Sequence, residues 1–297
     1  MTDAWIITGP TSGIGHRTAL RLAKHGTVVL VGRDQSKLDG VKGEIETGGG
    51  TALTVVADFS DIASVRRAAD EIIAMDIPIA GLLNNAGISP NEPSTSAQGW
   101  DLAFATNHLG PFAFTEALIP HLPDGANVVF IVSAVEDPDR KIAVRVGYRG
   151  SRYISAEAAA RGEWMSPGEA ATYNLNAYPT SKQGGLATVL SFAREFPRLH
   201  FRAIEPGVTP GTNLSRDSSR AVQVTAKVLS PVLALFPYFT TAGRAAKMIT
   251  GVTTDRSSAS GIYYDEKGNP MSGSRQVSDP AYQDRYVAES RQLLSTV

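Results

Sequence analysis

Six short apolar segments recur along the chain, most of them β-branched and bounded by glycine, asparagine, aspartate or serine. They cover residues 4–7, 28–31, 53–57, 81–83, 128–132 and 201–204. Runs of this length and composition predict strands that are buried on both faces. Between the first strands, apolar residues recur three and four positions apart, as at Leu38, Val41 and Ile45, which predicts amphipathic helices.

The alternation of predicted strands and helices indicates the architecture. Neighbouring parallel strands need a crossover connection, which is usually a helix. We therefore predict an α/β fold with one doubly wound parallel sheet, helices on both faces, and a binding crevice at the carboxyl ends of the strands. No linker divides the chain, so residues 1–297 are interpreted as one domain with an insertion at about 136–176, where charged and small residues are mixed.

Composition narrows the functions that the chain can have. The 297 residues carry 28 basic and 29 acidic side chains without a basic tract, so nucleic acid is not an expected partner. The lack of cysteine excludes disulfides and thiolate catalysis, and the histidines lack the spacing of metal ligands, so no metal is expected. Without a long apolar run or a targeting segment, we expect a cytoplasmic protein with no integral membrane association.

A glycine-rich loop, TGPTSGIG from Thr8 to Gly15, joins the first predicted strand to the first helix. Glycines at this spacing let the backbone turn tightly and approach a pyrophosphate at the helix N-terminus, where unpaired N–H groups attract anions. An ordinary glycine-rich turn is the alternative explanation for the loop by itself. If the loop binds a dinucleotide, the contacts come from Gly9, Thr11, Ser12, Gly13, Ile14 and Gly15.

Further polar motifs follow the predicted strands in a fixed order. They are Asp58 after the third strand, Asn84-Asn85-Ala86-Gly87 after the fourth, Asn107 in a later helical segment, Ser133 after the fifth strand, Tyr178 and Lys182 at the start of another helix, and Glu205-Pro206-Gly207 after the sixth strand. From residue 4 to about residue 265 the chain resembles the short-chain dehydrogenase/reductase family. Residues 260–264 and a predicted helix from Tyr282 to Leu294 are most similar to the branch with retinol dehydrogenases and protochlorophyllide reductase.

The resemblance implies a Rossmann-type NAD(P)-dependent oxidoreductase that interconverts a carbonyl compound and an alcohol. It assigns Tyr178 as general acid/base, Ser133 as a hydrogen-bond donor to the carbonyl oxygen, and Asn107 as the holder of a water that connects Lys182 to solvent. The spacing supports part of this: on a helix, Tyr178 and Lys182 share a face, so the ammonium can stabilise the phenolate and reach ribose hydroxyls. Because a free tyrosine has a pKa of about 10, acid/base work near neutrality needs a fall of roughly 2 to 3 units.

The end of the second predicted strand indicates which dinucleotide binds. An NAD site places a carboxylate there for the ribose hydroxyls, whereas a 2′-phosphate favours a guanidinium. Gly32 stands at the usual acidic position and Arg33 follows, so NADP(H) is the preferred cofactor; NAD(H), with Asp34 on the ribose, is the alternative. The other cofactor contacts implied by the resemblance are Asp58, Asn85, Ala86, Gly87, Tyr178, Lys182, Pro206, Gly207 and either Thr209 or Thr212.

Two departures from the family pattern bear on the substrate. The segment between Ser133 and Tyr178 is far longer than is usual in the family, so it is expected to loop out, return and cover part of the site. The apolar stretch 228–239 lies in the region 212–240, where the family has its substrate lid. A hydrophobic lid predicts a small apolar or aromatic carbonyl compound or alcohol as substrate. A helix that only packs on the core is the alternative explanation.

Two other functions compete with this interpretation. The chain could be a catalytically silent dinucleotide-binding sensor or interaction protein, but the presence of Tyr178, Lys182, Ser133 and Asn107 argues against it. A sugar-nucleotide epimerase is disfavoured because the glycine loop of those extended relatives is spaced differently. The resemblance also leaves a homo-oligomer open.

Overall fold

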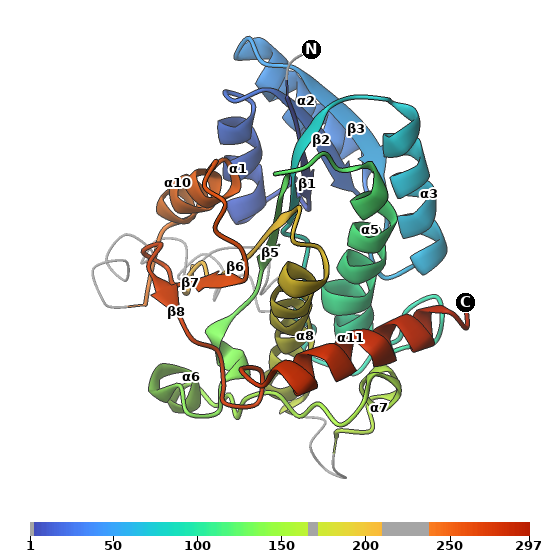
Figure 1. Ribbon diagram of the computed structural model, residues 1–297, viewed down its shortest axis with the longest axis vertical. Coiled ribbons are helices and arrows are strands. Elements are labelled where there is room, and N and C mark those ends of the chain that lie inside the picture. The colour runs from blue at the N-terminus through green and yellow to red at the C-terminus, as the bar shows by residue number, and fades with distance from the viewer. Residues whose placement is uncertain (1–2, 166–171, 210–237) are drawn as a thin grey trace.

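A mostly parallel sheet runs through the part of the chain that the structure describes, residues 3–165, 172–209 and 238–297 of a computed structural model (Figure 1). Its strand order is β3-β2-β1-β4-β5-β6-β7-β8. Pairing is parallel from β3 to β7, and β8 is antiparallel to β7. The strands are β1 (Ala4–Thr8), β2 (Thr27–Gly32), β3 (Ala52–Val56), β4 (Ile79–Asn84), β5 (Asn127–Ile131), β6 (His200–Ile204), β7 (Ile262–Tyr264) and β8 (Pro270–Met271).

Helices cover both faces of the sheet (Figure 1). The α-helices are α1 (Gly13–Leu22), α2 (Gln35–Thr47), α3 (Ile62–Ala74), α4 (Leu102–Phe104), α5 (Gly110–Leu118), α6 (Lys141–Arg145), α7 (Ala156–Arg161), α8 (Tyr173–Glu195), α10 (Ala242–Thr253) and α11 (Pro280–Leu294). A π-helical segment, η1 (Ala105–Leu109), joins α4 to α5, and the 3-10 helices are η2 (Ile119–His121) and η3 (Ala134–Glu136). The predicted doubly wound, Rossmann-type α/β architecture and its six strands are confirmed.

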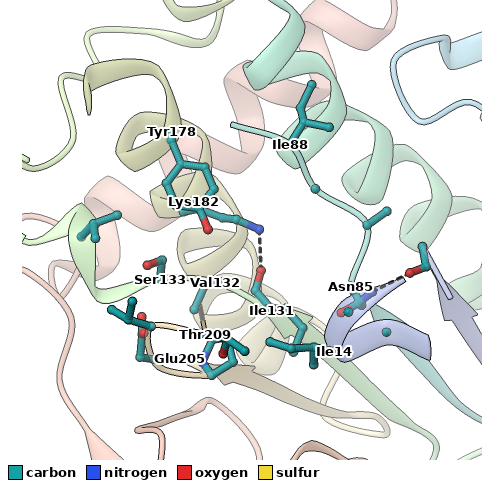
Figure 2. A pocket seen from close by; sticks show the side chains of 18 of the residues that line it. Ile14, Asn85, Ile88, Ile131, Val132, Ser133, Tyr178, Lys182, Glu205 and Thr209 are labelled. Atoms are coloured by element: carbon teal, nitrogen blue, oxygen red, sulfur yellow. Dashed lines mark hydrogen bonds between the residues drawn. The ribbon is translucent and has the colours of Figure 1, made fainter. Parts of the chain in front are cut away.

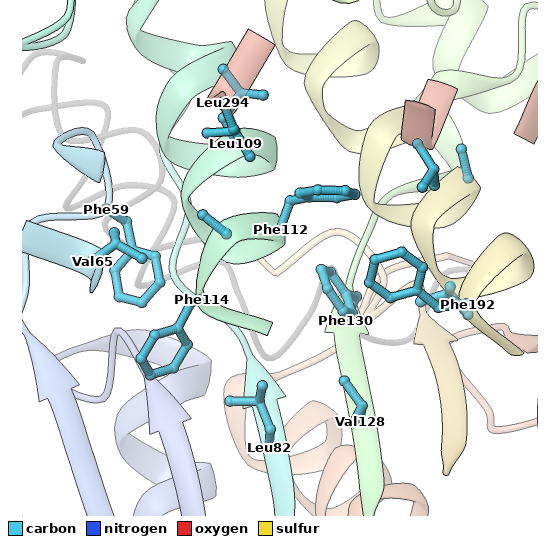
Figure 3. Close-up of a cluster of buried hydrophobic side chains, with 14 of the residues drawn as sticks. Phe59, Val65, Leu82, Leu109, Phe112, Phe114, Val128, Phe130, Phe192 and Leu294 are labelled. Atoms are coloured by element: carbon cyan, nitrogen blue, oxygen red, sulfur yellow. The ribbon is translucent and has the colours of Figure 1, made fainter. Parts of the chain in front are cut away.

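Alternating side chains of each strand supply two separate hydrophobic cores. On β1, Ile6 packs with residues of α3, α5 and α8, whereas Trp5 and Ile7 pack with α1, α2 and α10 on the opposite face. This alternation follows from the two-residue period of a strand. Aromatic rings fill the first core, where the ring centroids of Phe112 on α5 and Phe192 on α8 lie 5.4 Å apart (Figure 3).

The strand order places the binding crevice. The chain proceeds from β1 through β2 to β3 and then returns to pair β4 with the other side of β1. In open α/β sheets, ligands bind at the carboxyl ends of the strands at such a reversal. The glycine loop after β1 and residues 85–87 after β4 therefore meet at the predicted crevice.

Three segments differ from the prediction or extend it. Helix α8 begins at Tyr173, so Tyr178 lies in its second turn and not at its start, and Pro179 is accommodated inside the helix. The described part of the insertion forms η3, α6 and α7; between α6 and α7, Tyr153 stacks on Tyr286 of α11 with ring centroids 3.6 Å apart. Most of the expected lid at 212–240, including the apolar residues 228–237, lies outside the described residues.

Candidate active site

A cavity of about 780 Å³ opens at the carboxyl ends of the strands. Its wall includes residues from the glycine loop, the ends of β2 to β6, helix α8 and the insertion. Predicted site residues that line it are Gly9, Thr11, Ser12, Gly13, Ile14, Gly15, Arg33, Asp58, Asn85, Ala86, Gly87, Ser133, Tyr178, Lys182, Pro206, Gly207 and Thr209. Thr212 lies outside the described residues. The fold thus brings side chains that are distant in the sequence to one cavity.

The glycine loop is held tightly against the end of β4. Gly9 has φ +67°, and a Cβ there would lie 2.9 Å from Cα of Ala86. The side chain of Asn85 donates hydrogen bonds to the carbonyl oxygens of Thr8 and Gly9, at 2.8 and 3.2 Å. In return, the Thr8 hydroxyl accepts the backbone N–H groups of Asn85 and Ala86. Sequence reasoning assigned no role to Thr8, which belongs to this network.

The N-terminus of α1 is suited to an anion. Ser12 occupies the N-cap position without a side-chain cap, and the first turn contains no acidic residue. A helix N-terminus has unpaired backbone N–H groups and the positive end of the helix dipole. Because Gly13, Ile14 and Gly15 line the cavity, this end of the helix can bind a phosphate there.

The two charged residues after β2 have different surroundings. The Asp34 carboxylate accepts the backbone N–H of Lys37 at 3.2 Å, caps α2, and forms a 2.9 Å ion pair with the Lys37 ammonium. Hydrogen bonds from Lys37 and from Ser36 lower the pKa of Asp34 to about 2. Arg33 is exposed and lines the cavity. Of these two residues, Arg33 lines the cavity and Asp34 does not.

Asp58 lines the adjacent part of the cavity after β3. Its carboxylate accepts hydrogen bonds from the backbone N–H of Ser60 at 2.9 Å and from the Ser60 hydroxyl at 2.7 Å. Local bonds of this kind stabilise a turn. The turn sets the direction in which the chain leaves β3 toward α3.

Tyr178, Lys182 and Ser133 meet where α8 crosses the end of β5 (Figure 2). The Lys182 ammonium donates a 2.9 Å hydrogen bond to the carbonyl oxygen of Ile131 and lies 5.6 Å from the centroid of the Tyr178 ring. Ser133 is hydrogen-bonded to the Tyr178 side chain. All three side chains are buried, with exposed fractions of 9% or less.

Burial dominates the electrostatics of these groups. It lowers the pKa of Lys182 to about 8, while the negative charge of Glu205 raises that pKa in part. Burial raises the pKa of Tyr178, as do the charges of Tyr148 and Glu205, and a hydrogen bond donated by Ser133 would lower that pKa in part. In the protein alone, the pKa of Tyr178 is therefore raised. Acid/base catalysis by Tyr178 near neutral pH needs a lowered pKa, and this would take a positive charge that the protein itself does not supply.

Asn107 lies in the π-helical segment η1 and contacts the same region. Its side chain accepts the backbone N–H of Ile88 and donates to the Ile88 carbonyl oxygen, both at 2.8 Å, and it donates to the Ser181 hydroxyl at 2.9 Å. A Cβ at Gly87 would lie 3.2 Å from both Asn107 Oδ1 and Lys182 Nζ. The amide therefore connects the end of β4 to α8 beside the lysine. Single turns of π-helix occur frequently at functional sites.

Sequence reasoning assigned no role to several residues of the cavity, among them Glu205 after β6, and Arg140 and Tyr148 in the insertion. Glu205 directly precedes the Pro206-Gly207 pair, and an acidic residue between a buried strand and that turn was an available signal. Arg140 and Tyr148 had no comparable signal because they lie in a segment without periodicity. Arg140 lies over the ring of Tyr238 at 5.2 Å, and its Nε is buried without a hydrogen-bond partner.

Within residues 3–165, 172–209 and 238–297, no helix combines the length and the apolar composition that crossing a membrane requires.

Comparisons with known proteins agree with this geometry. The family model described as short chain dehydrogenase matches residues 3–152, from β1 into the insertion. Bovine dehydrogenase/reductase SDR family member 12 is 31% identical over 217 residues, which cover 71% of this chain and 63% of that relative's length. Human retinol dehydrogenase 11 is 36% identical over 124 residues, which cover 41% of this chain and 39% of the relative.

A solved structure has the same fold over most of the chain. The short-chain dehydrogenase from Burkholderia cenocepacia, in complex with NADP, has a TM-score of 0.66 and 22% sequence identity, and the match covers 90% of this chain and 97% of the other. The family that the motifs predict is thus confirmed by its own sequence model. The chain belongs to the short-chain dehydrogenase/reductase family and is an oxidoreductase.

Proposed function

We propose that the protein is an NADP(H)-dependent enzyme that interconverts a carbonyl compound and an alcohol, with Tyr178 as general acid/base. The observation that carries the proposal is the convergence of Tyr178, Lys182 and Ser133 at the wall of one cavity. A phenol, a buried amino group with a pKa of about 8 and a strand-end hydroxyl are the groups needed to move a proton to or from a substrate oxygen.

The rest of the cavity fits a dinucleotide. The glycine loop leaves no room for side chains at Gly9, and the uncapped start of α1 suits a pyrophosphate. Arg33 would hold a 2′-phosphate, since Asp34 is committed to capping α2. The Burkholderia relative in complex with NADP supports the same preference. When bound, the dinucleotide supplies or accepts the hydride.

The chain's own residues handle the proton and the substrate oxygen. In reduction, Tyr178 donates its proton to the carbonyl oxygen, and Ser133 hydrogen-bonds the same oxygen. Lys182, fixed by the Ile131 carbonyl, supplies positive charge beside the phenol. Asn107 stands beside Lys182 across Gly87 and would hold the water that connects the amino group to solvent.

The walls beyond the catalytic residues support an apolar or aromatic substrate. Apolar side chains that line this part of the cavity are Ile142, Ala143, Val146, Leu175, Val208 and Phe239. Burial of apolar surface is the main source of affinity in such pockets, while a few polar groups set the orientation. A cytoplasmic location and a homo-oligomer stay predictions from the sequence.

The test is a panel of apolar and aromatic aldehydes, ketones and secondary alcohols, with NADPH consumption or formation recorded by absorbance. We expect turnover by the unaltered protein and a loss of about 100-fold or more in Tyr178→Phe, because a positioned acid/base contributes at least that much. NADPH binding, measured by fluorescence, should persist in the variant. Equal turnover by both proteins would refute the role of Tyr178, and binding without turnover across the panel would favour a silent dinucleotide sensor.

A further inference from the structure

A second carboxylate lies inside the catalytic group. Glu205 follows β6, and because β6 pairs with β5, its side chain reaches the residues that follow β5 (Figure 2). One carboxylate oxygen accepts the backbone N–H of Ala134, and the other accepts the backbone N–H of Gly207 at 3.0 Å. The carboxylate is also hydrogen-bonded to the side chain of Ser133. Only 9% of the residue is exposed.

The partners of Glu205 indicate that it is built into the fold as an anion. A backbone N–H can only donate, and each carboxylate oxygen accepts one such group. A carboxylate accepts hydrogen bonds at both oxygens, whereas a carboxylic acid must present its own O–H to an acceptor. Burial raises the pKa of Glu205, and the three hydrogen-bond donors and the positive charge of Arg140 lower it in part.

An ionised Glu205 determines the direction of the hydrogen bonds around Ser133. A serine hydroxyl has one proton to donate. In the protein without substrate, a Ser133 that gives this proton to Glu205 can only accept a hydrogen bond from Tyr178. The neutral phenol can donate that bond, whereas a phenolate would have no donor at Ser133. The geometry therefore stabilises the protonated form of Tyr178.

Titratable groups from every neighbouring element face this carboxylate. Tyr178 and Lys182 come from α8, Arg140 and Tyr148 from the insertion, and Tyr263 from β7. The charge of Glu205 raises the pKa of Lys182 and of all three tyrosines, and the positive charge of Arg140 lowers the pKa of Glu205. The field of Glu205 thus holds protons on both members of the catalytic pair.

We propose that Glu205 is a positioning residue that keeps Tyr178 protonated, by taking the Ser133 proton and by its charge, and thereby favours carbonyl reduction over alcohol oxidation. Reduction needs the phenol as a proton donor, and oxidation needs the phenolate as an acceptor. The proton that leaves the Tyr178 oxygen in reduction goes to the substrate oxygen. The inference rests on the proposed function of the site.

The kinetic test compares pH profiles of kcat/KM for alcohol oxidation and carbonyl reduction. In Glu205→Gln, the pH at which oxidation becomes active and the pH at which reduction fails should both move down by about one unit or more, because a negative neighbour is removed. Glu205→Asp keeps the charge and should move both limits less. Glu266→Gln removes a different carboxylate of the cavity and should leave both limits in place. Unchanged limits in Glu205→Gln would overturn the proposal.

A second measurement needs neither cofactor nor substrate. The amino group of Lys182 is titrated by nitrogen NMR in the full chain, with the signal assigned through Lys182→Arg. In Glu205→Gln its pKa should fall below the value of about 8, because the charge that raises it is gone. An unchanged Lys182 pKa would show that the charge of Glu205 does not reach the catalytic pair.

These measurements separate the two hypotheses. An unaltered protein that turns over no compound refutes the proposed function, while the lysine titration still decides the effect of Glu205. Turnover that depends on Tyr178, with identical profiles in Glu205→Gln, refutes the role of Glu205 alone. If Glu205→Gln does not fold, carbon NMR of the Glu205 carboxyl in the unaltered chain replaces it: we expect a carboxylate at neutral pH, and a carboxylic acid there would overturn the proposal.

Discussion

Gly184 on α8 lies against the imidazole of His108 on η1 so closely that a Cβ at Gly184 would be 2.5 Å from His108 Nδ1. His108 is buried and cannot move aside easily, since its Nε2 is hydrogen-bonded to the Ser290 hydroxyl at 2.8 Å. This contact sets how near the segment with Asn107 approaches the helix with Tyr178 and Lys182. The close approach is also what lets Asn107 reach Ser181.

Gly184→Ala should separate these two elements. We expect a loss of about 1 to 3 kcal/mol in the free energy of unfolding, as for other overpacked cores, and a lower kcat because Asn107 and Lys182 are displaced. Gly185→Ala is the matched control: its Cβ would meet Val132 Cγ1 at 3.2 Å, a milder contact, so stability should change by less than about 1 kcal/mol. Chemical denaturation and steady-state kinetics measure both effects, and equal behaviour of the two variants would contradict the explanation.

His108 should make stability depend on pH in the acid range. Burial lowers its pKa from 6.5 to about 3, and the Ser290 hydroxyl already donates its proton to the Tyr286 carbonyl, so a neutral ring with its proton on Nε2 fits the site. Below pH 6.5 the unfolded chain binds a proton that the folded chain does not, so stability falls as the pH falls. Relative to His108→Gln, the unaltered protein should lose about 2.5 kcal/mol between pH 6.5 and about pH 4.5.

This difference is measured by urea unfolding of both proteins at several pH values. His108→Gln is expected to be the less stable protein at neutral pH, because Gln cannot reproduce the ring contacts with Phe104 and Tyr286. The informative quantity is therefore the change in the difference with pH. Parallel stability curves would show that His108 takes up its proton equally in both states.

Arg33→Ala should weaken the binding of NADPH much more than that of NADH. Arg33 is the cationic residue that lines the cavity after β2, and charge-assisted hydrogen bonds to a phosphate contribute about 1.5 to 3 kcal/mol, or roughly 10- to 100-fold in Kd. Lys37→Ala removes a neighbouring cation that pairs with Asp34, so it should affect both cofactors equally. Fluorescence titration gives the four affinities. Equal losses for both cofactors in Arg33→Ala would refute the phosphate contact.

Local patterns in the sequence were sufficient for most of the fold. The six predicted strands are those that short apolar runs mark in the sequence, and the glycine loop was identifiable because a tight turn against Ala86 leaves no room for a side chain. Strands β7 and β8 were not predicted, because three and two residues are too few to show a period. The sequence predicts that α8 starts at Tyr178, which is too late, because a proline such as Pro179 normally occurs in the first turn of a helix. In the structure the helix has one more turn before Tyr178, and the Tyr173 hydroxyl fixes that turn by donating a hydrogen bond to Asp101 at 2.5 Å.

By itself, the sequence determined where strands and helices alternate along the chain and which motifs follow each strand, since both depend on residues that are neighbours in the sequence. Only the tertiary structure decided which of those motifs share a cavity and which protonation states their side chains have. Glu205 and Ser133 are far apart in the sequence, and they meet because β5 and β6 pair in register, with Ile131 beside Ile204. The upward shift of the Tyr178 pKa likewise arises from burial and from charges supplied by distant segments, which no local pattern encodes.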